Sequence, residues 1–210
     1  MNSTRIWKEG TVVFLSIIIL SLSFIYKEMA ISYLELFLSI TLVVLVNVFA
    51  KKFFANNLET DINLNFWSIK HFGLRNSQHF KKPVPMLWLP IITTLASFGR
   101  FVWMPIIEFD VAPKPERISR RHGLYRFTEV TEWHVALIAA AGIFANVFFG
   151  IIGYFTGFEV FAKLSIYYAF WSIIPLGRLD GSKILFGSKN LWFGLLLLLS
   201  AILIWVLSIV

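Results

Sequence analysis

The sequence contains no cysteine in its 210 residues, and it has only four histidines. The lack of cysteine excludes disulfide bonds, thiolate ligands for zinc and a cysteine nucleophile. Charged residues are also scarce, at 15% of the chain, whereas soluble domains carry about 25%. The composition therefore excludes an ordinary water-soluble globular protein.

Apolar residues are what the chain has in excess. They make up 58% of it, and the mean hydropathy is +0.74. They occur in blocks whose lengths approach the roughly 20 residues that a helix needs to cross the hydrocarbon core of a bilayer. The sequence therefore predicts an all-α, multi-pass integral membrane protein, folded as a single membrane domain over residues 1–210.

We expect about six transmembrane helices from these blocks. The blocks are residues 11–26, 30–50, 83–107, 135–157, 161–176 and 191–210. The third contains Pro83, Pro85, Pro90 and Pro105, so its helix should be bent or interrupted. The fourth is rich in alanine and glycine, which lets helices approach closely and indicates a core position.

Two longer polar segments separate the blocks. Within the first, the alternation of polar and apolar residues over 61–66 predicts a strand. The second, residues 108–133, is rich in lysine and arginine and is expected to be a solvated loop at the membrane interface. Lysine and arginine are divided almost equally between the two sides of a six-helix arrangement, so the positive-inside rule does not fix its orientation.

The net charge of +7 predicts contact with the anionic headgroups of the lipid bilayer. Nucleic acid is not expected as a partner, because no recognition motif accompanies the basic residues. The transmembrane segments of other proteins remain as the expected protein partners.

Two short motifs resemble those of the site-2 protease family of intramembrane zinc metalloproteases. Residues 170–185 contain Pro175 and then Leu-Asp-Gly at 179–181, which is similar to the family's Asn-x-x-Pro-x-x-x-Leu-Asp-Gly, with Ser172 at the place of its Asn. Upstream, Ala-Gly-Ile-Phe-Ala-Asn at 141–146 is similar to its Ala-Gly-Pro-x-x-Asn. The resemblance implies a protease-like core over 44–187, preceded by N-terminal helices at 1–43 and followed by a C-terminal helix at 188–210.

The resemblance also implies a His-Glu-x-x-His motif on a preceding helix, where two histidines one turn apart hold zinc and the glutamate activates water. The sequence contains no such string. Lys-Phe-Phe-Ala at 52–55 is similar to the stretch that follows the motif in archaeal members, and this places residues 47–51 on the motif. Asn47, Val48 and Lys51 then stand where the family has its first histidine, its glutamate and its second histidine.

Of the implied catalytic and metal positions, Asn146 matches the residue that polarises a substrate carbonyl and Asp180 matches the third zinc ligand. One carboxylate cannot hold a catalytic zinc ion. We therefore expect no intact catalytic residue, no metal and no cofactor, with Asp180 as a relic ligand. The four histidines, His71, His79, His122 and His134, offer no pair at i, i+4 and are interpreted as interfacial residues.

Several polar residues admit two interpretations. Asp180 is a relic ligand or the cap of a helix that begins at Gly181. Asn146 is a relic of catalysis or a hydrogen-bonded bridge between helices, and bridging is favoured because no metal is expected. Arg100 and Glu35 mark a polar cavity or reach toward the headgroups.

The resemblance implies one geometric test. Asn47, Asn146 and Asp180 should converge at one level of the bundle, within about 15 Å or some three helical turns. Lys51 should point at the same neighbour as Asn47, because it lies one turn further along the helix. Its ammonium either pairs with Asp180 in place of a metal or extends to the interface, which would leave Asp180 to cap a helix or to protonate.

Three functions fit these observations. The first is a membrane protein of protease-like fold that has lost catalysis and binds or regulates other membrane proteins. The second is an active zinc-dependent intramembrane protease whose missing ligands come from elsewhere in the chain. The third is a small transporter or a structural subunit of a membrane complex.

Overall fold

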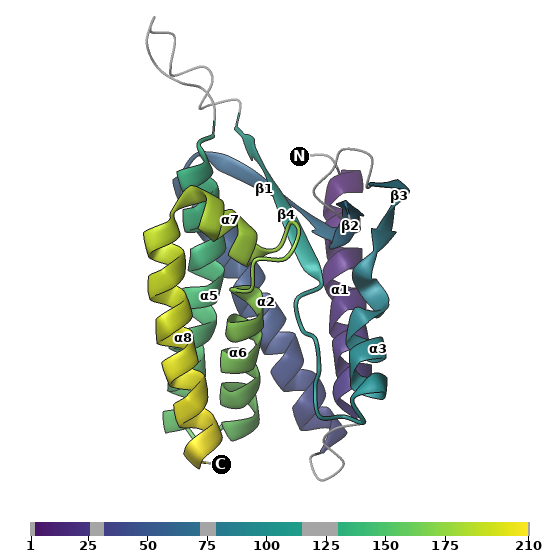
Figure 1. Cartoon of the computed structure of the whole chain (residues 1–210), viewed down its shortest axis with the longest axis vertical. Helices are drawn as coiled ribbons and strands as arrows, with labels where there is room; N and C mark the ends of the chain where they lie inside the picture. Colours follow the sequence, from purple (N-terminus) through teal and green to yellow (C-terminus); the bar gives the residue numbers. More distant parts are fainter. Residues whose placement is uncertain (1–2, 26–31, 72–78, 115–129, 210) are drawn as a thin grey trace, which may run out of the picture.

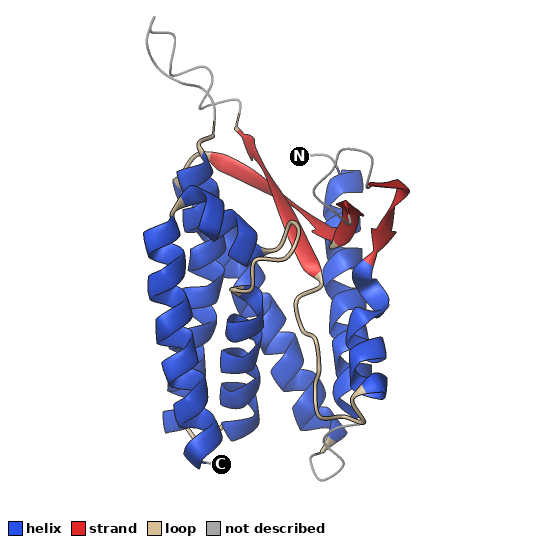
Figure 2. Ribbon diagram, in the orientation of Figure 1, coloured by secondary structure: helices blue, strands red, loops and turns tan. Residues whose placement is uncertain are grey.

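The computed structural model describes residues 3–25, 32–71, 79–114 and 130–209. Helices form an elongated bundle, and all the described strands lie at one end of it (Figure 1, Figure 2). This end of the molecule is called the strand end below. It also carries the N-terminal end of α1 (Ser3–Ile25) and the C-terminal end of α2 (Tyr33–Asn57).

Four described helices are long and apolar enough to cross a membrane. Besides α1 and α2, these are α5 (Glu132–Phe155) and α8 (Lys189–Ile209). Each can span a hydrocarbon core of about 30 Å at a rise of about 1.5 Å per residue. The helices expected over residues 11–26, 30–50, 135–157 and 191–210 are confirmed as elements, and the chain has the character of a membrane protein.

The other two apolar blocks form shorter helices. The block at 83–107 contains the end of β3 (His79–Pro85), the 3-10 helix η1 (Met86–Trp88) and α3 (Leu89–Ala96), followed by irregular chain. With 8 residues, α3 is about 12 Å long and cannot cross a bilayer. The block at 161–176 overlaps the 14-residue α6 (Glu159–Ser172). The expected interruption at the prolines is confirmed, and only four of the six blocks give helices of spanning length within the described residues.

The expected all-α class needs correction, because the chain also forms two antiparallel sheets. Strand β1 (Thr60–Phe66) pairs with β4 (Ile107–Pro113), and β2 (Ser68–His71) pairs with β3. The strand expected at 61–66 is confirmed. The start of the segment expected to be a loop, at 108–113, is instead strand β4, while residues 115–129 lie outside the described part of the chain.

Close approach between helices depends on the small residues of α5. A side chain at Gly153 would place its Cβ 2.7 Å from the ring of Phe161 on α6, and one at Gly150 would lie 3.1 Å from the Cβ of Ser165. Both separations are tighter than ordinary van der Waals contact. The structure therefore confirms α5 as a core helix with closely packed neighbours on two sides, α2 and α6.

Candidate functional site

A buried ion pair joins α2 to the short helix α7 (Asp180–Gly187). Lys51 Nζ donates to Asp180 Oδ2 at 2.6 Å, although the two residues are 129 positions apart in the sequence. Their side chains are only 3% and 5% exposed. Lys51 therefore does not extend to the interface, and of the two alternatives drawn from the sequence the paired arrangement is the one observed.

Asp180 is held in place by the start of α7. The N-cap of this helix is Leu179, and Asp180 occupies the first turn without a capping hydrogen bond. The interpretation of Asp180 as a cap is therefore wrong, although its carboxylate still benefits from the positive end of the helix dipole. A Cβ at Gly181 would lie 2.1 Å from the carbonyl oxygen of Ile173, so only glycine permits this approach of α7 to the chain after α6.

The second contact surface of Lys51 is Gly142 on α5. A Cβ at Gly142 would lie 2.7 Å from Lys51 Cε and 2.8 Å from Asn47 Nδ2. Asn146 is one turn further along α5, about 6 Å from Gly142. These contacts bring Asn47, Asn146 and Asp180 to one level of the bundle around Lys51, in agreement with the expected convergence.

The polar groups at this level are incompletely satisfied. Among the residues that the structure describes, Asn47 Nδ2, both side-chain polar atoms of Asn146, and Asp180 Oδ1 are buried without a hydrogen-bond partner. Asn146 therefore makes no direct hydrogen bond to a neighbouring helix in this part of the chain. Each unpaired buried group opposes folding by about 1–3 kcal/mol. Val48, at the position matched to the family's glutamate, is buried and has no group that could activate water.

Strand β4 covers the ion pair with Phe109, a residue that is only 1% exposed. Its ring centroid is 5.2 Å from Lys51 Nζ and 3.5 Å from Lys183 Nζ, so two ammonium groups approach one aromatic ring. Lys183 lies one turn after Asp180 on α7 and also donates to the carbonyl oxygen of Phe109. The backbone and ring of Phe109 therefore fasten β4 over α7.

Arg178 provides a second attachment of β4, just before α7. It contacts Asp110 and lies 3.6 Å from Glu108 Oε1. Burial raises the pKa of Glu108, and the Arg178 guanidinium opposes this rise. Burial also lowers the pKa of Lys183 from 10.5 to about 8. The cluster around the ion pair contains three cations and three carboxylates. The cations are Lys51, Arg178 and Lys183, and the carboxylates are Glu108, Asp110 and Asp180.

Strand β4, which covers the ion pair, was not predicted from the sequence. Its signal was the alternation of apolar Ile107, Phe109 and Val111 with acidic Glu108 and Asp110, which is the period of a strand. The nearby arginines and lysines made the segment resemble a solvated loop. Phe109, Arg178 and Lys183 were therefore not identified as neighbours of the ion pair.

The residues around the ion pair do not fit zinc. Catalytic zinc takes three protein ligands with free electron pairs, whereas an ammonium group has none to donate. Across residues 3–25, 32–71, 79–114 and 130–209, no group of three histidine, aspartate or glutamate side chains is arranged to hold a metal ion. Asp180 is engaged by Lys51, and Asn47 and Val48 offer no imidazole.

The remaining polar candidates lie elsewhere. His71 and His79 are register partners in β2 and β3, so they are in strands where loop positions were expected. His134 lies in the first turn of α5, at the helix edge as expected, and His122 is outside the described residues.

Glu35, in the first turn of α2, is exposed. Arg100 is exposed too, in the irregular chain after α3. Their exposure favours the interpretation that they reach the headgroups over that of a polar cavity.

Comparison of the chain with protein-family models, curated proteins and solved structures finds no match.

Proposed function

We propose that the chain is a catalytically inactive relative of the site-2 proteases that binds a transmembrane segment of another membrane protein. The observation that carries this proposal is the contact of 2.6 Å between Lys51 Nζ and Asp180 Oδ2. The family resemblance matched these residues to two zinc ligands that must meet in space. Their meeting across 129 positions supports both the alignment and the replacement of a metal by a cation.

The chemistry of this pair explains why catalysis is not proposed. A carboxylate buried at this level needs a positive charge beside it, because an uncompensated buried charge is strongly unfavourable. In a metalloprotease the metal supplies that charge, and here the Lys51 ammonium supplies it. Since ammonium cannot polarise water as zinc does, the site retains its charge balance and loses its reactivity.

A hollow lined by α2, α5 and Leu191 of α8 supports binding of a transmembrane helix. It has a volume of about 310 Å³ and only apolar lining residues. Its lining includes the small residues Ala50, Ala140, Ala141 and Ala145, together with the aromatic residues Phe53 and Phe144. Small residues let a second helix approach closely within a bilayer, where packing rather than hydrophobic burial drives association.

The first test measures metal and cleavage on the purified protein. We expect no stoichiometric zinc and no cleavage of transmembrane peptides in lipid, with or without added zinc. Zinc at one per chain, removed by a chelator together with loss of cleavage, would show that the chain is an active protease.

The second test concerns the partner. A photo-reactive amino acid at Ala145 should give a discrete protein adduct in native membranes, and Ala141→Leu should abolish that adduct by filling the hollow. The same group at Leu198, on the largely exposed helix α8, is the matched control and should give only lipid adducts. Equal adducts at Ala145 and Leu198 would contradict binding in the hollow.

A further inference from the structure

A separate cavity lies between α1, α2 and β1, and its lining is apolar in one part and charged in the other. Its volume is about 640 Å³, within the range of roughly 300–1,000 Å³ that is usual for ligand pockets. One part is walled by apolar residues of two helices, among them Phe14 and Ile17 on α1 and Leu45 and Phe49 on α2. The other part, at the strand end, is lined by charged residues.

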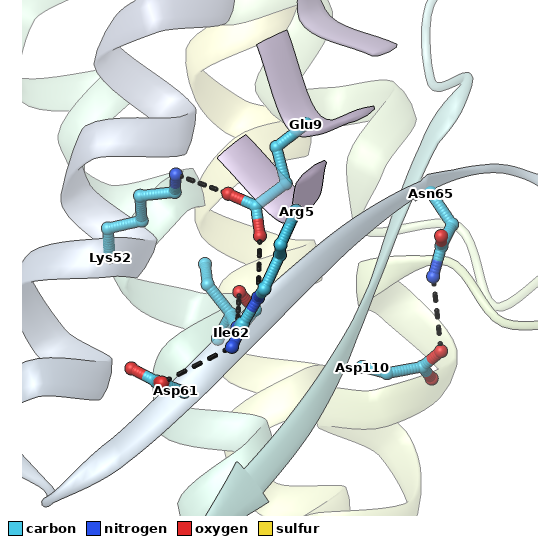
Figure 3. Close-up of polar contacts among 7 residues, drawn as sticks. All are labelled: Arg5, Glu9, Lys52, Asp61, Ile62, Asn65 and Asp110. Carbon is cyan, nitrogen blue, oxygen red and sulfur yellow. Dashed lines mark hydrogen bonds and ion pairs between the residues drawn. The ribbon is translucent and has the colours of Figure 1, made fainter. Parts of the chain in front are cut away.

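The charged rim connects the three elements through ion pairs (Figure 3). Arg5 on α1 contacts Glu9 at 3.3 Å and Asp61 on β1 at 3.4 Å, and it donates to the carbonyl oxygen of Ile62 at 2.8 Å. Lys52 on α2 reaches the other oxygen of Glu9 at 2.6 Å. The rim is therefore a built structure that holds α1 against α2 and β1.

Positive charge exceeds negative charge at this rim. Lys114 also lines the cavity and contacts the side-chain oxygen of Asn56, but within the described residues it pairs with no carboxylate. Arg5, Lys52 and Lys114 thus stand against Glu9 and Asp61. The Lys52 side chain is 43% exposed although it pairs with Glu9.

We infer that this cavity binds one glycerophospholipid with an anionic headgroup. The phosphate would lie by Lys52 and Lys114, and an acyl chain would run between Phe14 on α1 and Phe49 on α2. Such a ligand matches both halves of the cavity, because its charged and apolar ends are joined in one molecule. The cationic rim also lies at the end of the helices, where headgroups meet protein.

Two other occupants fit less well. Free phosphate would leave the apolar walls without a partner. A helix about 10 Å wide would have to separate α1 from α2 and so break the Lys52–Glu9 and Arg5–Asp61 contacts. The excess of positive charge favours an anionic lipid over a zwitterionic one.

The test is a lipid titration of the detergent-purified full chain, followed by native mass spectrometry. We expect phosphatidylglycerol to bind at one per chain, more tightly than phosphatidylcholine. Lys52→Ala/Lys114→Ala should weaken this binding about tenfold or more, since each 1.4 kcal/mol of lost interaction is a factor of ten. Lys8→Ala/Lys189→Ala, which removes two lysines that do not line the cavity, is the matched control and should bind as the wild type does.

The apolar half needs its own variant. Gly10 lines the cavity, and no atom lies within 4 Å of a Cβ added there, so Gly10→Trp can fill the space without a clash at its base. It should weaken lipid binding while the unfolding temperature stays unchanged. Equal affinity of the two double variants, equal binding of phosphatidylcholine, or full displacement of lipid by inorganic phosphate would overturn the inference.

Discussion

Lys51 and Asp180 form a contact of 2.6 Å between two helices that are far apart in the sequence, with both side chains almost fully buried. Lys52, the next residue, also pairs with a carboxylate at 2.6 Å, but its side chain is 43% exposed. The chain therefore contains two lysine–carboxylate pairs of equal length, adjacent in sequence and different in burial. This contrast provides an internal control for the energetics of the site.

Lys51→Ala should lower the free energy of unfolding by about 3–5 kcal/mol, because it leaves the Asp180 carboxylate buried without its direct partner. Lys52→Ala should lower it by less, because Lys52 is 43% exposed and Glu9 keeps its contact with Arg5. Unfolding in mixed detergent, followed by circular dichroism, measures both changes.

The double variant Lys51→Met/Asp180→Leu completes the test. Removing both charges should restore much of the stability lost in Lys51→Ala, because an apolar pair of similar volume avoids desolvation. Equal stability of Lys51→Ala and Lys52→Ala would show that the buried pair is not a significant constraint on the fold.

Gly142→Ala should destabilise the protein by about 1–3 kcal/mol, the usual range for overpacking. The added Cβ would lie 2.7 Å from Lys51 Cε, so the lysine must move away from Asp180. Gly10→Ala is the matched control, since it is also a helical glycine but has nothing within 4 Å of the added atom. It should be neutral or stabilising by up to about 1 kcal/mol.

A coupling measurement separates strain on Lys51 from strain on the backbone. In a Lys51→Ala background, Gly142→Ala should cost much less than in the wild type, because the side chain it meets has been removed. The same cost in both backgrounds would indicate that Asn47 or the backbone, rather than Lys51, resists the substitution. Thermal unfolding of the four proteins provides the comparison.

The long helices were predictable because their apolar runs exceed what any soluble element needs. Strand β1 was also predictable, since the alternation over 61–66 is a local pattern. Strand β4 was not identified, because its equally regular alternation adjoins a basic segment and its partner β1 is far away in the sequence. Local pattern could not distinguish a paired strand from a solvated loop.

At the candidate site, the sequence predicted which residues meet and not how they are surrounded. The matched motifs placed Lys51 near Asp180, but the choice between a buried pair and an extended lysine depends on packing by α5 and β4. Two residues favour the buried pair. Gly142 allows the close approach of α5, and Phe109 covers the pair. The hydrogen bonding of Asn146 could not be predicted either, because it depends on the same tertiary contacts.

Stability should rise with pH above about 8 through Lys183, which lies on α7 outside the four helices of spanning length. Burial lowers its pKa in the folded protein from 10.5 to about 8. Between these values the unfolded chain binds more protons than the folded chain, so raising the pH favours folding. Well below pH 8, Lys183 is protonated in both the folded and the unfolded chain, so it does not make stability depend on pH.

Lys183→Met should remove this part of the pH dependence. The difference in unfolding free energy between variant and wild type, measured from pH 7 to 10, isolates the contribution of Lys183. Parallel curves for the two proteins would contradict a lowered pKa at this position.

The strand end should face the cytoplasm. Almost all described lysines and arginines lie at that end, because the chain that descends through α3 beside α1 runs back to the strand end as β4 (Figure 1). They are Arg5, Lys8, Lys51, Lys52, Lys70, Lys81, Lys82, Lys114, Arg178, Lys183 and Lys189, whereas Arg100 and Lys163 lie toward the other end. The positive-inside rule did not orient a chain with six crossings, but it places the strand end of this arrangement in the cytoplasm.

Because the chain contains no cysteine, single cysteines can report this orientation directly. Asn190→Cys, at the start of α8, should be protected from an impermeant maleimide in intact cells. Thr156→Cys, at the end of α5, should react, and both positions are exposed. The reverse labelling pattern would place the strand end outside.

Gly181 is required by the path of the backbone between α6 and α7. A Cβ there would lie 2.1 Å from the Ile173 carbonyl oxygen and 2.6 Å from that of Ile174, a steric demand that has nothing to do with metal. Any larger residue at Gly181 would have to displace backbone, so the substitution should disrupt the fold whatever the chain does. The glycine of Leu-Asp-Gly therefore has a structural role in this chain, because it lets the polypeptide turn back sharply after α6.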